Sequence, residues 1–272
     1  MSNFGPIDTS VLYGQLNHRT EDVSENPDTT LSVRRGDIAF FRVLQLAPRH
    51  IRVLQVLQNM GFLGVLQCGH VEIDTHLITA LVERWRPETH TFHFSVGEAT
   101  ITLQDIAILW ALPVEENTSD DDSPFEAVLQ EARICAMCIL GGVLCPDATG
   151  NTVSLLYLRH MENIHEQYVS NWGSAVLAYL YRELCTSSQR GKNNIGGAMQ
   201  LLQIWAWSRI ITLAPIPSSE SSTLMPTIID PDNVLPNPPY AARWSYHISR
   251  THTAHNALRI IRNVLDLYLD SV

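Results

Sequence analysis

The spacing of apolar residues changes three times between residues 80 and 114. Helical spacing ends at Trp85–Arg86–Pro87, and an alternating run follows through Phe92 and Phe94. A polar turn at 96–98 leads into a second short alternating run, after which helical spacing returns from Leu103. These changes predict a helix, a small β-hairpin at about residues 89–102, and a second helix.

Helical spacing also marks most of the remaining chain, and several helix ends carry capping residues. Asp74 is a candidate N-cap for a helix over 75–85, and Thr102 with Asp105 forms a capping-box pattern for the helix that follows. Further helices are predicted over 38–46, 51–60, 124–140, 153–163, 172–184, 198–211 and 254–269. The pattern therefore predicts a mainly α, multi-helix globular domain with one small hairpin.

The division of the chain follows from composition along its length. Residues 1–36 are polar and are predicted to form an N-terminal arm, whereas 37–272 read as a single helical domain. Residues 212–240 hold seven of the fourteen prolines and a serine cluster, which predicts an irregular connection. The buried centre of the hairpin region and of the later helices is predicted from their large aromatic residues: Trp85, Phe92, Phe94, Trp110, Trp172 and Trp205.

Charge and cysteine content narrow the functional classes. The 272 residues carry a formal net charge of −10, and Lys192 is the sole lysine among 18 basic residues. Such an anionic chain does not favour direct nucleic-acid binding, which needs clustered cations. Five cysteines without a secretory signal indicate reduced thiols. No uninterrupted apolar run approaches the roughly 20 residues of a membrane span, so no membrane role is expected.

Candidate chemistry is weak throughout the chain. Cys135 and Cys138 form a CxxC inside a predicted helix and lack a partner pair, so they are interpreted as buried apolar residues rather than zinc ligands. The histidine pairs lack a carboxylate-bracketed or HExxH arrangement, and the glycine-rich loop 191–197 follows a helix instead of a strand. We expect no metal, no cofactor and no catalytic residues, and hence no enzyme.

Four sequence blocks resemble the plant mobile domain, a family of maintenance-of-meristems-like proteins and transposon-related proteins. The first is Gly5–Pro6–Ile7–Asp8 with the residues up to Tyr13; the second spans Leu77–Leu112, with ERWR and ETHTFH at its centre. The third lies at 150–158, and the fourth runs from Trp172–Gly173–Ser174 to Trp207. The resemblance departs at Glu115–Ser123, which is shorter than in the family, and in the short C-terminal region.

The resemblance implies a nuclear, non-catalytic plant protein. Its relatives act with a type-7-like serine/threonine phosphatase in transposon silencing, gene expression, genome stability and meristem maintenance. Related sequences are often called aminotransferase-like, but pyridoxal chemistry needs a Schiff-base lysine. Lys192 is the single candidate and lies in a polar loop, so aminotransferase activity is not expected.

Three hypotheses remain open from the sequence. The first is an interaction module whose partner surface includes Arg84, Arg86, Glu88 and His90. The second is a domesticated transposon protein that binds nucleic acid through a patch of arginines, and the third is an unrecognised enzyme. Ion pairing of Arg84 and Arg86 with Glu83, Glu88 or Glu98 is the structural alternative to a binding role. The arginine patch would require these residues to share one face: Arg34, Arg35, Arg42, Arg49, Arg52, Arg84 and Arg86.

Overall fold

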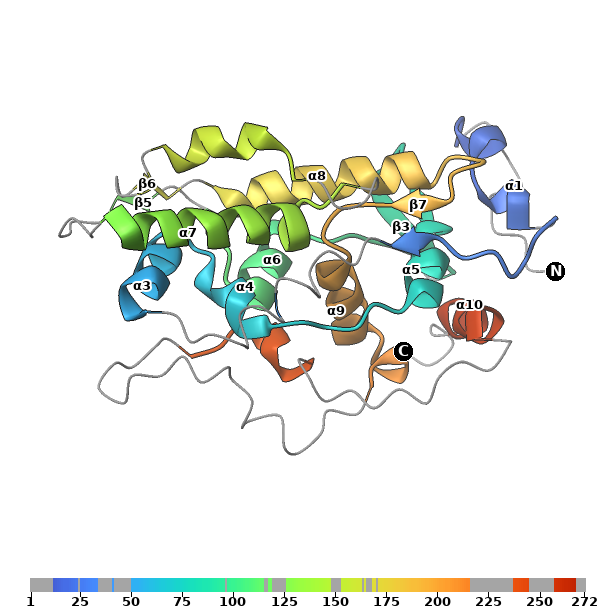
Figure 1. Ribbon diagram of the computed structural model, residues 1–272. Coiled ribbons are helices and arrows are strands. Elements are labelled where there is room, and N and C mark those ends of the chain that lie inside the picture. Colours follow the sequence, from blue (N-terminus) through green and yellow to red (C-terminus); the bar gives the residue numbers. More distant parts are fainter. Residues whose placement is uncertain are drawn as a thin grey trace.

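Helices dominate the protein, as the sequence predicts (Figure 1). The computed structural model describes residues 12–23, 25–33, 41, 50–95, 97–114, 117–118, 126–147, 153–162, 164, 168–169, 171–215, 237–244 and 257–267. The α-helices are α1 (Thr20–Val23), α3 (Ile51–Asn59), α4 (Leu63–Cys68), α5 (Thr75–Val82), α6 (Leu103–Trp110), α7 (Glu126–Ile139), α8 (Trp172–Ser187), α9 (Met199–Arg209) and α10 (Ala257–Leu267). The mainly α fold class is confirmed.

Short strands, four 3₁₀ helices and one π-helix complete the described architecture. The strands form three small sheets: β2 (Trp85–Arg86), β3 (Thr91–Phe94) and β4 (Gly97–Ala99) are antiparallel, β1 (Ser32–Val33) pairs in parallel with β7 (Asn194–Ile195), and β5 (Asn117–Thr118) pairs with β6 (Tyr168–Val169). The other helical turns are η1 (Gln15–Asn17), η2 (Leu140–Leu144), η3 (Leu155–Met161), η4 (Ile211–Leu213) and η6 (Tyr240–Trp244).

Helix α9 occupies the centre of the protein. All residues from Met199 to Trp207 are buried, which is typical of a helix surrounded by others rather than one with a solvated face. The buried amide of Gln203 is satisfied on both sides, since it donates to Glu72 O at 2.8 Å and accepts from Asp74 N at 2.6 Å. Gln203 therefore fixes the loop that leads into α5.

Local capping signals predicted two helix starts correctly. The Asp74 carboxylate accepts from the backbone N–H groups of His76 and Leu77 at the start of α5. Thr102 and Asp105 form the complete capping box at the start of α6. Such caps satisfy N–H groups that lack partners within the helix, so their effect does not depend on what the helix packs against.

The hairpin prediction is correct in place but incomplete. The helix before it ends at Val82 rather than residue 85, and Trp85–Arg86 form a third strand in which Trp85 pairs with Phe92. Pro87 disfavours helical backbone at the preceding residue, and β3 offers hydrogen-bonding partners to the extended chain. The segment is therefore a three-stranded antiparallel sheet.

Other predicted elements differ in detail. The helix predicted over 153–163 is the 3₁₀ helix η3, and the predicted loop 191–197 contributes strand β7. The predicted arm is folded against the domain over the described part of residues 12–33, because β1 pairs with β7. The predicted helix 38–46, apart from Phe41, and the irregular segment over 216–236 lie outside the described residues.

Helix α7 continues into the wider π-type turn η2. Together, Glu126–Leu144 are long and apolar enough to cross a membrane by length and composition, but half of the most apolar window is buried inside the protein. A core helix meets the same criteria, so this segment carries no membrane argument. Gly141 lies in η2, where an added Cβ would overlap both γ-carbons of Val153.

This close approach predicts a background-dependent effect of Gly141→Ala. In the natural chain the substitution should lower the free energy of unfolding by about 1–3 kcal/mol through overpacking. In a Val153→Ala background the clash is gone, and the better helix propensity of alanine should make it neutral or stabilising. Denaturant unfolding of the natural chain, Gly141→Ala, Val153→Ala and the double variant measures both effects. An equal loss of stability from Gly141→Ala in both backgrounds would contradict the packing argument.

Candidate functional site

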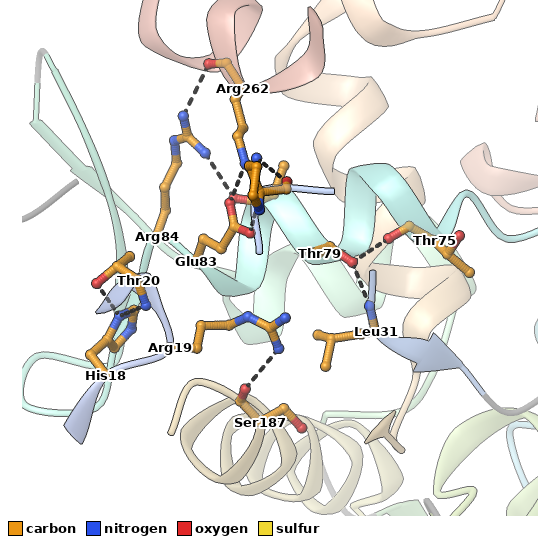
Figure 2. Close-up of polar contacts among 12 residues, drawn as sticks. His18, Arg19, Thr20, Leu31, Thr75, Thr79, Glu83, Arg84, Ser187 and Arg262 are labelled. Carbon is orange, nitrogen blue, oxygen red and sulfur yellow. Dashed lines mark hydrogen bonds and ion pairs between the residues drawn. The ribbon is translucent and has the colours of Figure 1, made fainter. Parts of the chain in front are cut away.

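Residues 83–93, the centre of the second sequence block, are called the signature segment below. Its Glu83 and Arg84 belong to a cluster of charges that joins parts of the chain distant in sequence (Figure 2). Glu83, just after α5, accepts two hydrogen bonds from Arg262 of α10, at 2.7 Å from Nε and 2.6 Å from Nη2. The side-chain exposures are 0% for Glu83 and 7% for Arg262. A bidentate guanidinium–carboxylate pair satisfies the geometry of both groups, which a buried charge requires.

Arg84 extends this cluster toward the C-terminal end of α10. Its guanidinium donates to Ala80 O at 2.8 Å and Arg262 O at 3.0 Å, and it forms an ion pair with Asp266. Burial lowers the pKa of Arg84, and the nearby Asp266 carboxylate opposes that shift. Ser95, beyond β3, donates from Oγ to Asp266 O at 2.8 Å, so α10 also contacts the turn between β3 and β4.

The N-terminal segment contributes both a cation and an acceptor. Arg19 donates to Lys192 O at 3.2 Å, next to the end of α8, and Pro27 O accepts from Arg262 at 2.6 Å. Burial lowers the pKa of Arg19, while Glu83 is the main charge opposing the shift. We call Arg19, Glu83, Arg84, Arg262 and Asp266 the ion cluster; its first four members are buried and Asp266 is half-buried.

His18 lies beside the ion cluster as a buried neutral imidazole. Its Nε2 is 2.9 Å from Trp85 O, which can accept only, so Nε2 carries the proton. Nδ1 accepts from Thr20 N at 3.3 Å. Burial lowers the pKa of His18 to about 3, and the positive charge of Arg86 adds to that effect.

The outer face of the hairpin carries the polar residues that remain accessible. His93 Nε2 is 3.3 Å from Glu98 Oε1, and Thr91 donates to Glu98 Oε2 at 2.7 Å. His90 is exposed and has a positive φ of 54°, an uncommon conformation for a residue with a side chain. Its ring stacks on Tyr181 at a centroid distance of 5.6 Å.

The predicted partner surface is only partly on the surface. Arg84 and Arg86 are 4% and 2% exposed, so their predicted surface role is wrong. The physical reason is that α10 and the N-terminal segment pack over them. Glu88 is half-buried and accepts from Gly14 N at 2.6 Å, whereas His90 lies at the surface.

For Arg84 the ion-pairing alternative holds, but with a partner other than those predicted. Arg84 pairs with Asp266 rather than Glu83, Glu88 or Glu98, and Glu83 is occupied by Arg262. Within the proposed arginine patch, Arg52 is exposed; Arg34, Arg35, Arg42 and Arg49 lie outside the described residues. The burial of Arg84 and Arg86 removes two cations from that patch.

The aromatic residues of the signature lie mostly in the core. The structure buries Trp85, Phe92, Trp110, Trp172 and Trp205 and leaves Phe94 half-buried. Phe92 connects them, since its ring centroid is 4.8 Å from that of Trp85 and 5.2 Å from that of Trp205.

The other candidate chemistry finds no site in the described part of the chain. Cys135 is buried, Cys138 is half-buried and neither forms a disulfide, while Lys192 is exposed. Among the residues with described positions, no group of three or more His, Cys, Asp or Glu residues could hold a metal.

Sequence reasoning missed the α10 and N-terminal members of the ion cluster. One signal for α10 was present: Leu258, Arg262 and Leu265 follow helical spacing, so the arginine lies on the apolar face. A charged residue on such a face requires a buried partner. No comparable local signal marks His18 or Arg19.

Comparison with known proteins identifies a family and several relatives. The Plant mobile domain model matches residues 61–118 and 119–271. The chain is 32% identical to an Arabidopsis thaliana protein called Serine/threonine-protein phosphatase 7 long form homolog, over 98% of this chain and 23% of that protein. It is 29% identical to Protein MAIN-LIKE 2 of the same plant, over 76% of this chain and 37% of the relative.

A third relative, Protein MAINTENANCE OF MERISTEMS from Arabidopsis thaliana, is 28% identical over 57% of this chain and 41% of its own length. The chain thus spans less than half the length of each of these curated relatives. No solved structure shows significant similarity. The alignment with the phosphatase 7 long form homolog runs over 311 positions, whereas this chain has 272 residues. That relative therefore carries residues that have no counterpart in this chain.

The Glu83–Arg262 pair predicts a strong non-additive effect on stability. Arg262→Met leaves a buried carboxylate without its bidentate partner and should cost about 3–5 kcal/mol of unfolding free energy. Adding Glu83→Leu removes that charge and should recover part of the loss. Chemical denaturation of the natural chain, both single variants and the double variant gives a double-mutant cycle. Additive losses of unfolding free energy would contradict coupling between the two residues.

His18 predicts a loss of stability in mild acid. The unfolded chain binds a proton at His18 near pH 6.5, whereas the folded chain does so only near pH 3, so the contribution is complete above pH 6.5 and falls with decreasing pH. Between pH 6.5 and 5 the loss is about 2 kcal/mol. His18→Gln should flatten this dependence in denaturation curves, while the surface variant His160→Gln should not; parallel curves for all three proteins would contradict the assignment.

Proposed function

Because this chain belongs to the plant mobile domain family, we propose that it is a non-catalytic interaction module that docks a phosphatase-like partner. One observation carries the proposal: nearly the whole chain is similar to about a quarter of a protein named as a phosphatase 7 long form homolog. In that relative, a segment of this kind is continuous with a longer polypeptide. A chain of the same family can make the corresponding contacts with a phosphatase-like protein.

The biological setting forms part of the proposal. The names of two other relatives, Protein MAIN-LIKE 2 and Protein MAINTENANCE OF MERISTEMS, support a role in meristem maintenance. Nuclear location, transposon silencing, control of gene expression and genome stability are proposed from the family resemblance. The net charge of −10 and the burial of Arg84 and Arg86 favour a protein partner over nucleic acid.

We place the docking surface around His90, in the turn between β2 and β3. Two observations support this choice: the residue is exposed, and its positive φ is held by Tyr181 stacking and by the hydrogen bond from Thr100 Oγ1 to His90 O at 2.8 Å. These contacts hold an exposed side chain in one position, and such preorganisation favours a docking residue because little is lost in ordering it on binding.

His90→Gly should separate binding from folding. Glycine accepts the positive φ, so stability should be kept, while loss of the ring should weaken partner binding by about tenfold, or 1.4 kcal/mol. Tagged proteins are expressed in plant cells, and recovered phosphatase-family proteins are quantified by mass spectrometry.

Ala111→Gly provides the matched control, because Ala111 also has a positive φ, 51°, but lies at the end of α6. It should recover the partner as the natural chain does. Recovery of no phosphatase-family protein by any variant would contradict the proposed function. Equal recovery by the natural chain and His90→Gly would contradict the docking surface alone.

A further inference from the structure

Ser95 links the turn between β3 and β4 to the last turn of α10. The residue is exposed, and its hydroxyl donates from Oγ to Asp266 O at 2.8 Å, across 171 positions of sequence. Asp266 is the last residue but one of α10, and carbonyl groups in the final turn of a helix lack partners within that helix. The Ser95 hydroxyl therefore satisfies a carbonyl group at the C-terminal end of α10.

The end of α10 already carries negative charge at this contact. The Asp266 side chain is 35% exposed, and the partial negative charge of the helix dipole lies at the same end. Arg84, which pairs with Asp266, is buried and also donates to Ala80 O and Arg262 O, so its guanidinium has little capacity for another anion. The exposed Arg259 lies seven positions before Asp266, about 10 Å along the helix axis.

The turn that carries Ser95 is accessible from solvent. Gly97, two positions later, is exposed, and a Cβ added to it would meet no described atom within 4 Å. Glu98 follows at the third position after Ser95, with 48% of its side chain exposed. An accessible serine followed at this spacing by a carboxylate is the charge pattern that acidophilic protein kinases select in their substrates.

We propose that Ser95 is a phosphorylation site that controls the docking of α10. An acidophilic protein kinase transfers the γ-phosphoryl group of ATP to the Ser95 hydroxyl. A bond forms between Oγ and phosphorus, the bond from phosphorus to ADP breaks, and the hydroxyl proton passes to the catalytic base of the kinase. The modified side chain can no longer donate to Asp266 O, and it carries a charge of about −1.5 to −2 at pH 7.

The added charge acts against the docked position of α10. A phosphate beside a carboxylate and at a helix C-terminus disrupts a contact through like-charge repulsion. Displacement of Asp266 also removes the ion-pair partner of Arg84, so both contacts at this end of α10 are lost together. Undocking of α10 uncovers Glu83 and Arg84, and phosphorylation thereby changes the surface of the signature segment. This inference does not rest on the proposed partner or on the docking surface around His90.

Hydrogen exchange of the full chain tests the effect of the phosphate. Phosphoserine is introduced at position 95 by genetic code expansion, and exchange of the backbone amides is followed by mass spectrometry. The amides of α10 should exchange about tenfold faster or more than in the unmodified chain, while those of the central helix α9 should be unchanged. Ser95→Ala removes the hydrogen bond without adding charge, so it should accelerate exchange by only about threefold.

Two comparisons separate repulsion at α10 from a general effect of phosphate. Phosphoserine at the exposed Ser154, the N-cap of η3 beside α7, is the matched control and should leave α10 unchanged. In an Asp266→Asn background, phosphorylation of Ser95 should accelerate exchange of α10 much less than in the natural chain. Unchanged α10 exchange on phosphorylation of Ser95 would overturn the proposal, and so would an equal acceleration in the Asp266→Asn background.

Modification in the cell is tested on the tagged natural chain. The chain is purified from plant cells in the presence of phosphatase inhibitors, and the peptide that contains Ser95 is analysed by mass spectrometry. We expect a phosphorylated fraction of this peptide, which should be absent from Ser95→Ala. Recovery of the unmodified peptide alone would overturn Ser95 as a modification site and would leave the proposed function unaffected.

Discussion

The arrangement of this protein depends on one buried carboxylate. Glu83 has no exposed side-chain surface, so its charge must be neutralised by the protein itself. Arg262 does so with two hydrogen bonds, and that requirement determines where α10 packs. Because Arg262 also donates to Pro27 O, the same guanidinium brings the N-terminal segment against α5. The two ends of the described chain thus meet at the signature segment through one side chain.

A buried ion pair of this kind specifies an arrangement more than it adds net stability. Removing two charges from water costs several kcal/mol each, and the pair recovers this cost only in one geometry. An apolar helix could slide along α5 with modest loss, but the Glu83–Arg262 pair is satisfied in a single register. The second contact, from Arg84 to Asp266 one turn later in α10, selects that same register.

The sequence predicts those features that arise from neighbouring residues. Asp74 and Thr102 cap their helices through bonds within three positions, so both starts were predictable. Strand β2 was missed because Trp85 becomes extended only when it pairs with Phe92 after a turn. Arg84 was misplaced on the surface because its partner Asp266 lies 182 positions away. For α10, the apolar spacing around Arg262 indicated that this arginine needs a buried partner, but it could not identify Glu83 as that partner.

These contacts explain why the signature identifies a family without revealing chemistry. Glu83 and Arg84 connect α10 to the domain, while Trp85 and Phe92 lie in the core, so selection for folding is sufficient to keep such residues. Binding specificity must then come from exposed positions beside them, which fold stability leaves free to vary. His90 differs from its buried neighbours because it is accessible and has a positive φ, which residues with a side chain seldom adopt. A shared signature therefore indicates a shared scaffold, and differences in partner are to be sought at exposed positions around His90.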